Sequence, residues 1–378
     1  MQDISLYIHI PFCKKKCLYC DFPSFAGLES IYEDYTNSIL REICENRHEY
    51  SHMNVKTVFI GGGTPTVLPS KLMGNIIDAV FEKYNVDNGA EFTVETNPGA
   101  IDKHYLKELK SMYVNRLSFG LQAWQDDLLK KLGRIHTVKD FVANYYEARE
   151  TGFDNINCDL MFSLPGQTVK QWEETLRNII KINPEHISAY SLIIEDGTQF
   201  KEMAMEGKIA EADENTDRQM YYMAEEMLES SGYGRYEISN FSKPGFESRH
   251  NLAYWNTKEY IGFGLGAHSY NNGKRFHNTY DIGKYISSKG NIIKLREDTE
   301  NLSLEEKMEE FMFMGLRLKR GVDINDFKQR FGADVWSVYK KAIEDLLYEG
   351  LLEKSGEFLR LTKLGTDLSN YVFEKFIF

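Results

Sequence analysis

Three cysteines near the start of the chain constrain its chemistry more than any other feature. Cys13, Cys17 and Cys20 stand within eight residues, in the run HIPFCKKKCLYCDF at positions 9–22. Three thiols this close can converge on one metal centre, but they cannot complete a four-thiolate site. A cubane of four irons and four sulfides held by three cysteines leaves one iron open to another ligand.

Two other interpretations of these thiols have to be weighed. A structural zinc usually takes four ligands from two spaced pairs, and no second CxxC pair follows in this chain. A disulfide needs an oxidising compartment, and three neighbouring cysteines would leave one unpaired. We therefore expect a 4Fe-4S cluster on these cysteines, with zinc or inert thiols as the alternatives. Cys44 and Cys158 are interpreted as buried small residues rather than ligands.

Length and charge narrow the class of protein. The 378 residues, 42% of them hydrophobic, suffice for one large domain and a smaller one. A net charge of -12 argues against nonspecific binding to nucleic acid or to an anionic membrane, because the mean field repels phosphate. We find no apolar run of about eighteen residues and no signal peptide, so no integral membrane segment is expected. An odd number of cysteines and an oxygen-labile cluster favour a cytoplasmic location.

Short β-rich runs alternate with longer helical patterns over the first part of the chain, which indicates βα units around a parallel sheet. We predict strands at 4–9, 57–60, 91–95, 116–119, 156–160 and 187–191. Helices are predicted at 31–49, 70–84, 102–112, 137–151 and 168–182, where apolar residues recur every three or four positions. The fold class is therefore α/β, and six strands suggest a barrel short of closure.

Three segments are expected in the chain. Residues 1–235 form the partial barrel, and residues 236–300 form a connecting segment rich in glycine and aromatic residues. Residues 301–378 show helical patterns at 303–317, 323–330 and 335–349 and a strand at 358–361, an order that resembles a winged helix. With the net negative charge, we interpret this smaller α+β domain as a lid or interaction module rather than a DNA reader.

Polar or glycine-rich residues follow the predicted strands, at the edge where parallel barrels assemble their sites. The run GGGTPT at 61–66 lets the backbone approach a ligand, although a glycine triplet alone is as often a tight turn. Glu95 ends one strand and can bind a ribose hydroxyl or an amine, and Gln122 follows another and can pair with a carboxylate or an adenine edge, unless both simply cap loops. Asp159 ends an apolar strand, where a charge is costly to bury without a partner, so we expect a ligand or a structural hydrogen-bond role for it. Arg134 offers a bidentate fork for a carboxylate, or is an exposed arginine.

CxxxCxxC with an aromatic residue before the last cysteine resembles the signature of the radical S-adenosylmethionine (SAM) superfamily. In that superfamily the open iron is chelated by SAM, and an electron passed through the cluster releases a 5'-deoxyadenosyl radical. The resemblance implies a partial (β/α)6 barrel of the TIM type. Together with the strand ends, the pattern resembles the subgroup related to oxygen-independent coproporphyrinogen III dehydrogenase (HemN). This implies SAM contacts from Tyr7, Tyr19, Gly62, Gly63, Thr64, Glu95, Gln122, Arg134 and Asp159.

Two features resemble the HemW branch, described as heme chaperones. The dehydrogenase carries CxxxCxxCxC, whereas Phe22 stands at the fourth position here, and residues 250–255 match HNxxYW. The second motif implies heme ligation by His250, with Tyr254 and Trp255 offering flat surface to the porphyrin. A turn that packs two aromatic residues would need no heme. His268, in the glycine-rich run 262–269, is an alternative axial ligand or a turn histidine.

The resemblance thus predicts a heme chaperone that binds a 4Fe-4S cluster, SAM and heme and delivers heme to an acceptor protein. The alternative is the dehydrogenase of porphyrin biosynthesis, and a radical SAM enzyme with an unrelated substrate is a third interpretation. Whether the chain is an enzyme stays open. An electron donor such as flavodoxin or ferredoxin is expected, and Lys14–Lys16 could help to dock an acidic one.

Overall fold

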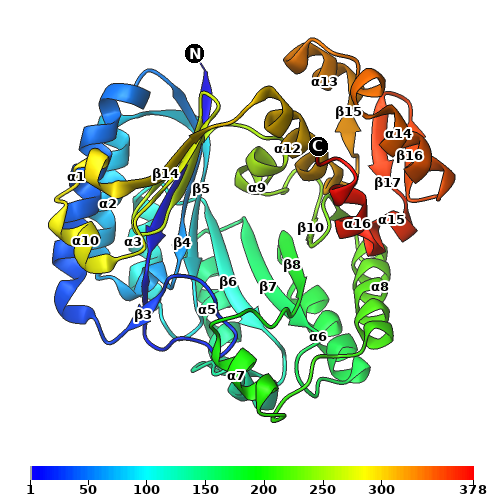
Figure 1. Cartoon of the computed structure of the whole chain (residues 1–378). Helices are drawn as coiled ribbons and strands as arrows, with labels where there is room; N and C mark the ends of the chain where they lie inside the picture. Colours follow the sequence, from blue (N-terminus) through cyan, green and yellow to red (C-terminus); the bar gives the residue numbers. More distant parts are fainter. Residues whose placement is uncertain (1) are drawn as a thin grey trace.

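A single 12-stranded sheet forms the centre of the protein, in a computed structural model that describes residues 2–378. The strand order is β14-β13-β12-β11-β1-β4-β5-β6-β7-β8-β10-β9, so the sheet is open (Figure 1). All six predicted strands are confirmed and pair in parallel as β1 (Asp3–Ile10), β4 (Asn54–Gly62), β5 (Asn85–Thr96), β6 (Arg116–Gln122), β7 (Ile156–Phe162) and β8 (His186–Ser191). The expected partial barrel is therefore confirmed.

Helices follow the parallel strands, and each of the five predicted ones forms. They are α1 (Tyr32–Tyr50), α2 (Ser70–Lys83), α3 (Lys103–Ser111), α5 (Val138–Glu150) and α6 (Val169–Ile182). Capping boxes begin two of them, with Thr137 and Asp140 at α5 and Thr168 and Gln171 at α6. Three helices that we did not predict are α4 (Asp126–Lys131), α7 (Gln199–Met205) and α8 (Glu214–Ser230).

The two faces of β1 differ in the side chains that they carry, and one of them faces the functional residues described below. Ile4, Leu6, Ile8 and Ile10 are buried in the main core, whereas Ser5, Tyr7 and His9 alternate with them and point to the other face. We call this other face of the sheet the inner face. Residues of neighbouring strands that pair with Ser5 or Tyr7 point to the inner face as well.

Residues 236–300, expected as a connecting segment, supply further strands of the same sheet. They are β10 (Asn240–Ser242), β11 (Tyr260–Phe263), β12 (His268–Asn271), β13 (Lys274–Asn278) and most of β14 (Arg296–Asn301), and β9 (Gly234–Arg235) precedes them. β11 pairs in parallel with β1, while β12, β13 and β14 continue antiparallel. The helices of this segment are α9 (Arg249–Trp255), α10 (Ile282–Ser287) and α11 (Ile292–Leu295).

The C-terminal residues form a second unit with a hydrophobic core of its own, which includes Phe311, Phe327, Leu346 and Leu359. Its elements are α12 (Leu304–Leu316), β15 (Val322–Asp323), α13 (Ile324–Phe331), α14 (Val335–Tyr348), β16 (Leu352–Ser355), β17 (Phe358–Leu361), α15 (Lys363–Asp367) and α16 (Ser369–Glu374). The three predicted helices and the predicted strand are all present. Figure 1 shows this unit, from orange to red, beside α8 and on the opposite side of the molecule from α1 and α2.

None of the helices within residues 2–378 combines the length and the apolar character needed to cross a membrane.

Candidate functional site

A cavity of about 500 Å³ opens at the C-terminal ends of the parallel strands. Ten of the twelve residues that the sequence marks for the cluster and SAM line it: Cys13, Cys17, Cys20, Tyr19, Gly62, Gly63, Glu95, Gln122, Arg134 and Asp159. Thr64 lies in a smaller hollow next to it, which shares Cys17 and Arg134 with the cavity. The twelfth residue, Tyr7, does not line the cavity, and its hydroxyl lies 2.9 Å from His9 Nδ1. Residues far apart in the sequence thus meet at one edge of the sheet, as the strand pattern predicts.

The loop between β1 and α1 carries the three cysteines and is tied to the barrel at several points. It contains two short paired strands, β2 (Phe12–Cys13) and β3 (Phe25–Ala26). The amide of Leu18 donates to the carbonyl of Leu132 at 3.0 Å, and the amide of Phe200 in α7 donates to the carbonyl of Leu18 at 2.9 Å. Leu18, next to Cys17, is therefore bonded both to the segment after α4 and to α7.

The environment of the sulfur atoms suits metal-bound thiolates. Burial raises the pKa of the Cys13 and Cys20 thiols, so both are protonated in the free protein. Thr64 donates to the Cys13 sulfur at 3.6 Å, and the Arg134 guanidinium donates to the Cys17 sulfur at 3.5 Å. Such donors stabilise the thiolate form that an iron site requires.

The donor set fits a cluster better than a single ion. Within residues 2–378, no three His, Cys, Asp or Glu side chains are grouped closely enough to hold one ion. Zinc would need four ligands around one point. A cubane takes each cysteine on a different iron, so its ligands are spread more widely, and the cavity beside the three sulfurs provides the volume.

Gly62 and Gly63 are glycines because the end of β4 packs directly against the cysteine loop. Gly62 has a φ of 108°, and a Cβ on it would lie 2.4 Å from the ring of His9. A Cβ on Gly63 would lie 2.6 Å from the carbonyl oxygen of Phe12. His9, which the sequence analysis did not select, also shares a hydrogen bond of 2.9 Å with Tyr7 Oη and one of 2.9 Å with the Pro23 carbonyl. Tyr7 therefore supports the loop through His9.

Two carboxylates share the cavity and influence each other. Glu95 accepts a hydrogen bond of 3.0 Å from the amide of Gly62, yet burial and then the charge of Asp159 raise its pKa to about 7. Burial also raises the pKa of Asp159, which accepts hydrogen bonds from Ser118 at 3.1 Å and Asn157 at 2.8 Å. A ligand with positive charge would favour the ionised form of both groups.

Arg134 is buried and bonded rather than exposed. Its guanidinium donates to the side-chain oxygen of Asn97 at 2.5 Å and to the Gly120 carbonyl. Asn97 in turn donates to Thr64 Oγ1 at 2.6 Å. Asn97 was not among the predicted site residues, although Asn97 directly follows the third strand in the run VETNP and so resembles Glu95 in its position. Gln122, with a φ of 72°, turns the chain at the end of β6.

The HNxxYW segment lies elsewhere, on the inner face of the sheet. His250 in α9 is buried and stacks on Phe59, with 5.1 Å between ring centroids. Its Nδ1 is 2.7 Å from Thr57 Oγ1 and its Nε2 is 2.9 Å from Tyr254 Oη. Burial lowers the pKa of His250 to about 3, so the ring is neutral. In this conformation both ring nitrogens are engaged within the protein.

Trp255, the last residue of this motif, faces the C-terminal unit. The guanidinium of Arg317 stands 4.4 Å from its ring centroid. The motif therefore links the barrel to the region around α12. His268, the other candidate heme ligand, lies on β12 and is exposed.

Comparisons with known proteins agree with this geometry. The model of the Radical SAM superfamily matches residues 7–179, and that of the HemN C-terminal domain matches residues 302–368. The chain is 39% identical over 374 residues to the heme chaperone HemW of Bacillus subtilis, with 99% of each chain covered. It is 31% identical over 381 residues to the heme chaperone HemW of Escherichia coli, covering 100% of this chain and 99% of that one.

Among solved structures, the chain is similar to coproporphyrinogen III oxidase (HemN) from Escherichia coli, a radical SAM enzyme. The TM-score is 0.87 at 21% identity, with 99% of this chain and 90% of that chain covered. At this level of identity the likeness shows the fold alone.

Proposed function

Because this chain belongs to the HemW family of radical SAM proteins, we propose that it is a heme chaperone, which binds heme and delivers it to a heme-requiring acceptor protein. The full-length identity of 39% to a protein of that name carries the proposal. Phe22, exposed in the cysteine loop at the position where the dehydrogenase has a fourth cysteine, supports it.

The cavity would hold the two cofactors of the superfamily. We assign the cluster to Cys13, Cys17 and Cys20, and SAM to the nine other predicted residues, seven of which line the cavity. When bound, the cluster supplies an electron and an open iron for SAM. The protein contributes a buried carboxylate pair, Glu95 and Asp159, that favours the cationic ligand, and a guanidinium, Arg134, that steadies the Cys17 thiolate.

Two further assignments belong to this proposal. The electron donor would be an acidic protein such as flavodoxin or ferredoxin, because the exposed Lys14 and Lys15 lie at the mouth of the hollow next to Cys17. A cytoplasmic location follows from the oxygen sensitivity of such a cluster.

The assignment of heme to His250, Tyr254 and Trp255 stays a prediction. Ligation through Nε2 requires that the hydrogen bond between His250 and Tyr254 open and that α9 move away from Phe59. Such a change in structure would be visible as altered exchange of the α9 amides when heme is added.

An anaerobic titration of the purified full-length protein with hemin tests the proposal, with and without SAM and with the cluster oxidised or reduced. We expect a saturable shift of the Soret band at about one heme per chain, and transfer of that heme to an apo-hemoprotein. Absence of binding in every cluster and SAM state would exclude the chaperone function. Catalytic formation of protoporphyrinogen IX from coproporphyrinogen III would instead establish the alternative, a coproporphyrinogen III dehydrogenase.

A further inference from the structure

We propose that ferric heme binds on an exposed patch of the inner face, made by His268, His277, Tyr280 and the Phe22–Pro23 segment, with His268 as the iron ligand. We call this the imidazole patch. The inference rests on the proposed function, since it assigns the cargo of the chaperone to a place on the chain. It differs from the prediction that the HNxxYW segment holds the heme.

The patch is built by two antiparallel strands. His268 on β12 and His277 on β13 are directly opposite in register, and their ring centroids are 5.1 Å apart. The ring of Tyr280, just after β13, lies 5.0 Å from that of His277 and 6.4 Å from that of His268. Three flat rings, two of them imidazoles, thus stand together on one surface.

This surface belongs to the same face of the sheet as the residues behind the cavity. Tyr260 is paired with Ser5, two residues before Tyr7, and Tyr270 is paired with Tyr260. His268 is two residues before Tyr270 in β12, so its side chain leaves the sheet on the inner face. The partner residues on the other face, Ser269 and Phe276, are buried. A planar ligand could therefore approach His268 from the inner side alone.

Through Phe22 and Pro23, the patch includes part of the cysteine loop. Gly266 has a φ of 62°, and a Cβ on it would lie 2.6 Å from the Tyr280 ring and 3.5 Å from Pro23 Cγ. Tyr280 and Pro23 therefore both lie next to Gly266. Phe22, which precedes Pro23 in the chain, has 58% of its surface exposed, and Tyr280 has 49% of its surface exposed. These two rings offer apolar area to a macrocycle within a few residues of Cys20.

Among the nine histidines, His268 is the one best prepared to ligate iron on this face. His9, His186 and His250 are buried and have both ring nitrogens in hydrogen bonds. His268 is exposed, and only its Nε2 is engaged, at 2.9 Å from Tyr280 Oη. Partial burial and the neighbouring His277 lower its pKa, which keeps the ring neutral with a lone pair to donate.

His277 is placed as a support rather than as a ligand. Its Nδ1 is 2.8 Å from the carbonyl of Asn278 and its Nε2 is 3.0 Å from Asp298 Oδ2. Burial alone would lower the pKa of His277, but these two acceptors raise it above its ordinary value. Both nitrogens face acceptors, and these contacts fix the ring beside His268.

The chemistry favours an iron porphyrin over a bare cation. Within residues 2–378 no three His, Cys, Asp or Glu side chains converge on an ion, whereas heme brings four nitrogens of its own and needs one or two axial ligands. The heme propionates require positive charge at the rim. Lys16 is exposed and its Nζ lies 3.0 Å from the carbonyl of Phe22, at the edge of the patch.

Anaerobic hemin titration of the full-length protein and three variants tests the assignment, read by the Soret band and by electron paramagnetic resonance of the ferric iron. We expect His268→Ala to weaken binding at least tenfold and to change the axial-ligand signature. His104→Ala, which removes an exposed histidine on α3, should bind as the wild type does. His250→Ala tests the rival ligand: loss of its Soret shift, with His268→Ala unchanged, would assign the iron to the HNxxYW segment and contradict the imidazole patch.

Two further outcomes separate the inference from the proposed function. If the wild type binds hemin and His268→Ala binds it equally well with an unchanged spectrum, the assignment of heme to the imidazole patch is wrong while the chaperone function stands. If the wild type binds no hemin, both fail. Tyr280→Phe provides an independent check, because it keeps the ring but releases His268 Nε2. Its affinity should equal or exceed that of the wild type, and a tenfold loss would contradict ligation by His268.

Discussion

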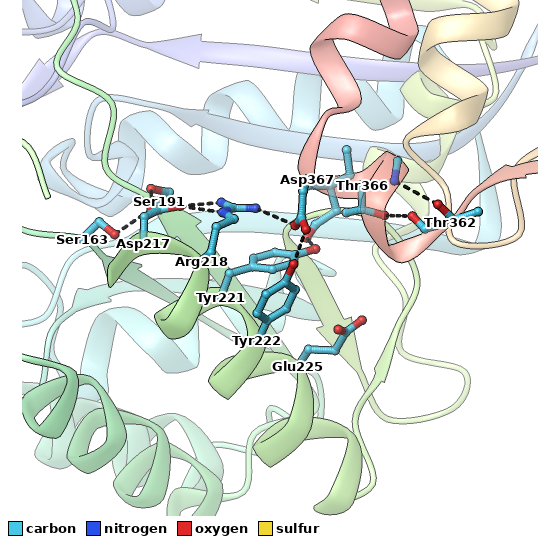
Figure 2. A network of polar contacts seen from close by, with 12 residues as sticks. Ser163, Ser191, Asp217, Arg218, Tyr221, Tyr222, Glu225, Thr362, Thr366 and Asp367 are labelled. Atoms are coloured by element: carbon cyan, nitrogen blue, oxygen red, sulfur yellow. Dashed lines mark hydrogen bonds and ion pairs between the residues drawn. The ribbon is translucent and has the colours of Figure 1, made fainter. Parts of the chain in front are cut away.

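Arg218 of the barrel donates a hydrogen bond to Asp367 of the C-terminal unit, with 3.2 Å between Nη1 and Oδ1 (Figure 2). The same guanidinium donates to Asp217, whose carboxylate accepts from Ser191 at the cavity wall. Tyr222, one helical turn from Arg218, donates to the other oxygen of Asp367. A continuous chain of polar contacts thus joins α15 of the C-terminal unit to the edge of the proposed SAM cavity.

Replacement of Asp367 by Ala should loosen the attachment of the C-terminal unit. It would leave Tyr222 without its acceptor and Arg218 with Asp217 alone, and because the guanidinium is about one-third exposed we expect a loss of only about 1 kcal/mol in unfolding free energy. Urea unfolding followed by circular dichroism measures it. Asp345→Ala, an exposed change in the same unit, is the control and should have no effect. Equal stability of both variants would show that the contact carries no energy.

Replacement of Gly62 by Ala should disrupt the cysteine loop. The new Cβ would fall 2.4 Å from the His9 ring, at a backbone φ of 108° that L residues rarely adopt. We expect a loss of roughly 2 to 4 kcal/mol in stability and reduced iron content after anaerobic reconstitution. Gly27→Ala is a matched control, since its φ is 75° and no atom lies within 4 Å of its Cβ position. If both variants lose the same free energy of unfolding, backbone strain rather than the His9 contact explains why position 62 requires a glycine.

The sequence predicted well those features that depend on local pattern. Strand β7 and the helix after it follow from apolar periodicity, and Cys13, Cys17 and Cys20 follow from spacing alone. It missed His9, because a histidine inside an apolar strand gives no sign that a glycine 53 positions later will pack on its ring. It also missed β11–β14, whose short, glycine-interrupted strands join a sheet that is completed only by distant pairing with β1.

The pH dependence of SAM binding should report on Glu95. Its pKa of about 7 in the free protein means that a cationic ligand must displace a proton below that pH. Affinity should therefore rise by up to about tenfold per unit between pH 5.5 and 7 and level off above about pH 8. Equilibrium dialysis on the cluster-loaded protein measures it.

Two variants isolate the contribution of Glu95 from that of the amino group of SAM, which also loses a proton as the pH rises. Glu95→Gln should bind more weakly and show a shallower dependence over the same range. Asp159→Asn removes the charge that helps to raise the pKa of Glu95, so its curve should move to lower pH. Identical slopes for the wild type and Glu95→Gln would exclude Glu95 from the SAM site.

Glu42 should anchor the strands that carry the imidazole patch. This buried carboxylate, 2% exposed, accepts from Tyr285 Oη at 2.6 Å, from the Gly264 amide at 3.0 Å and from Asn278 Nδ2 at 2.6 Å. Glu42→Ala removes the acceptor of three buried donors, of which Asn278 keeps its bond to the Gly264 carbonyl, so we expect a loss of about 3 kcal/mol in unfolding free energy. The effect should be seen by urea unfolding, together with faster amide exchange in β13.

The charge state of Glu42 gives this prediction a pH test. Burial raises its pKa from 4.5 to about 7, so between these values the unfolded chain has lost a proton that the folded protein retains. The contribution of Glu42 to stability is therefore complete below pH 4.5 and declines as the pH rises to about 7. The difference in unfolding free energy between the wild type and Glu42→Gln, which cannot ionise, should follow that decline. A difference that does not change across pH 4.5 to 7 would show that Glu42 ionises normally in the folded protein.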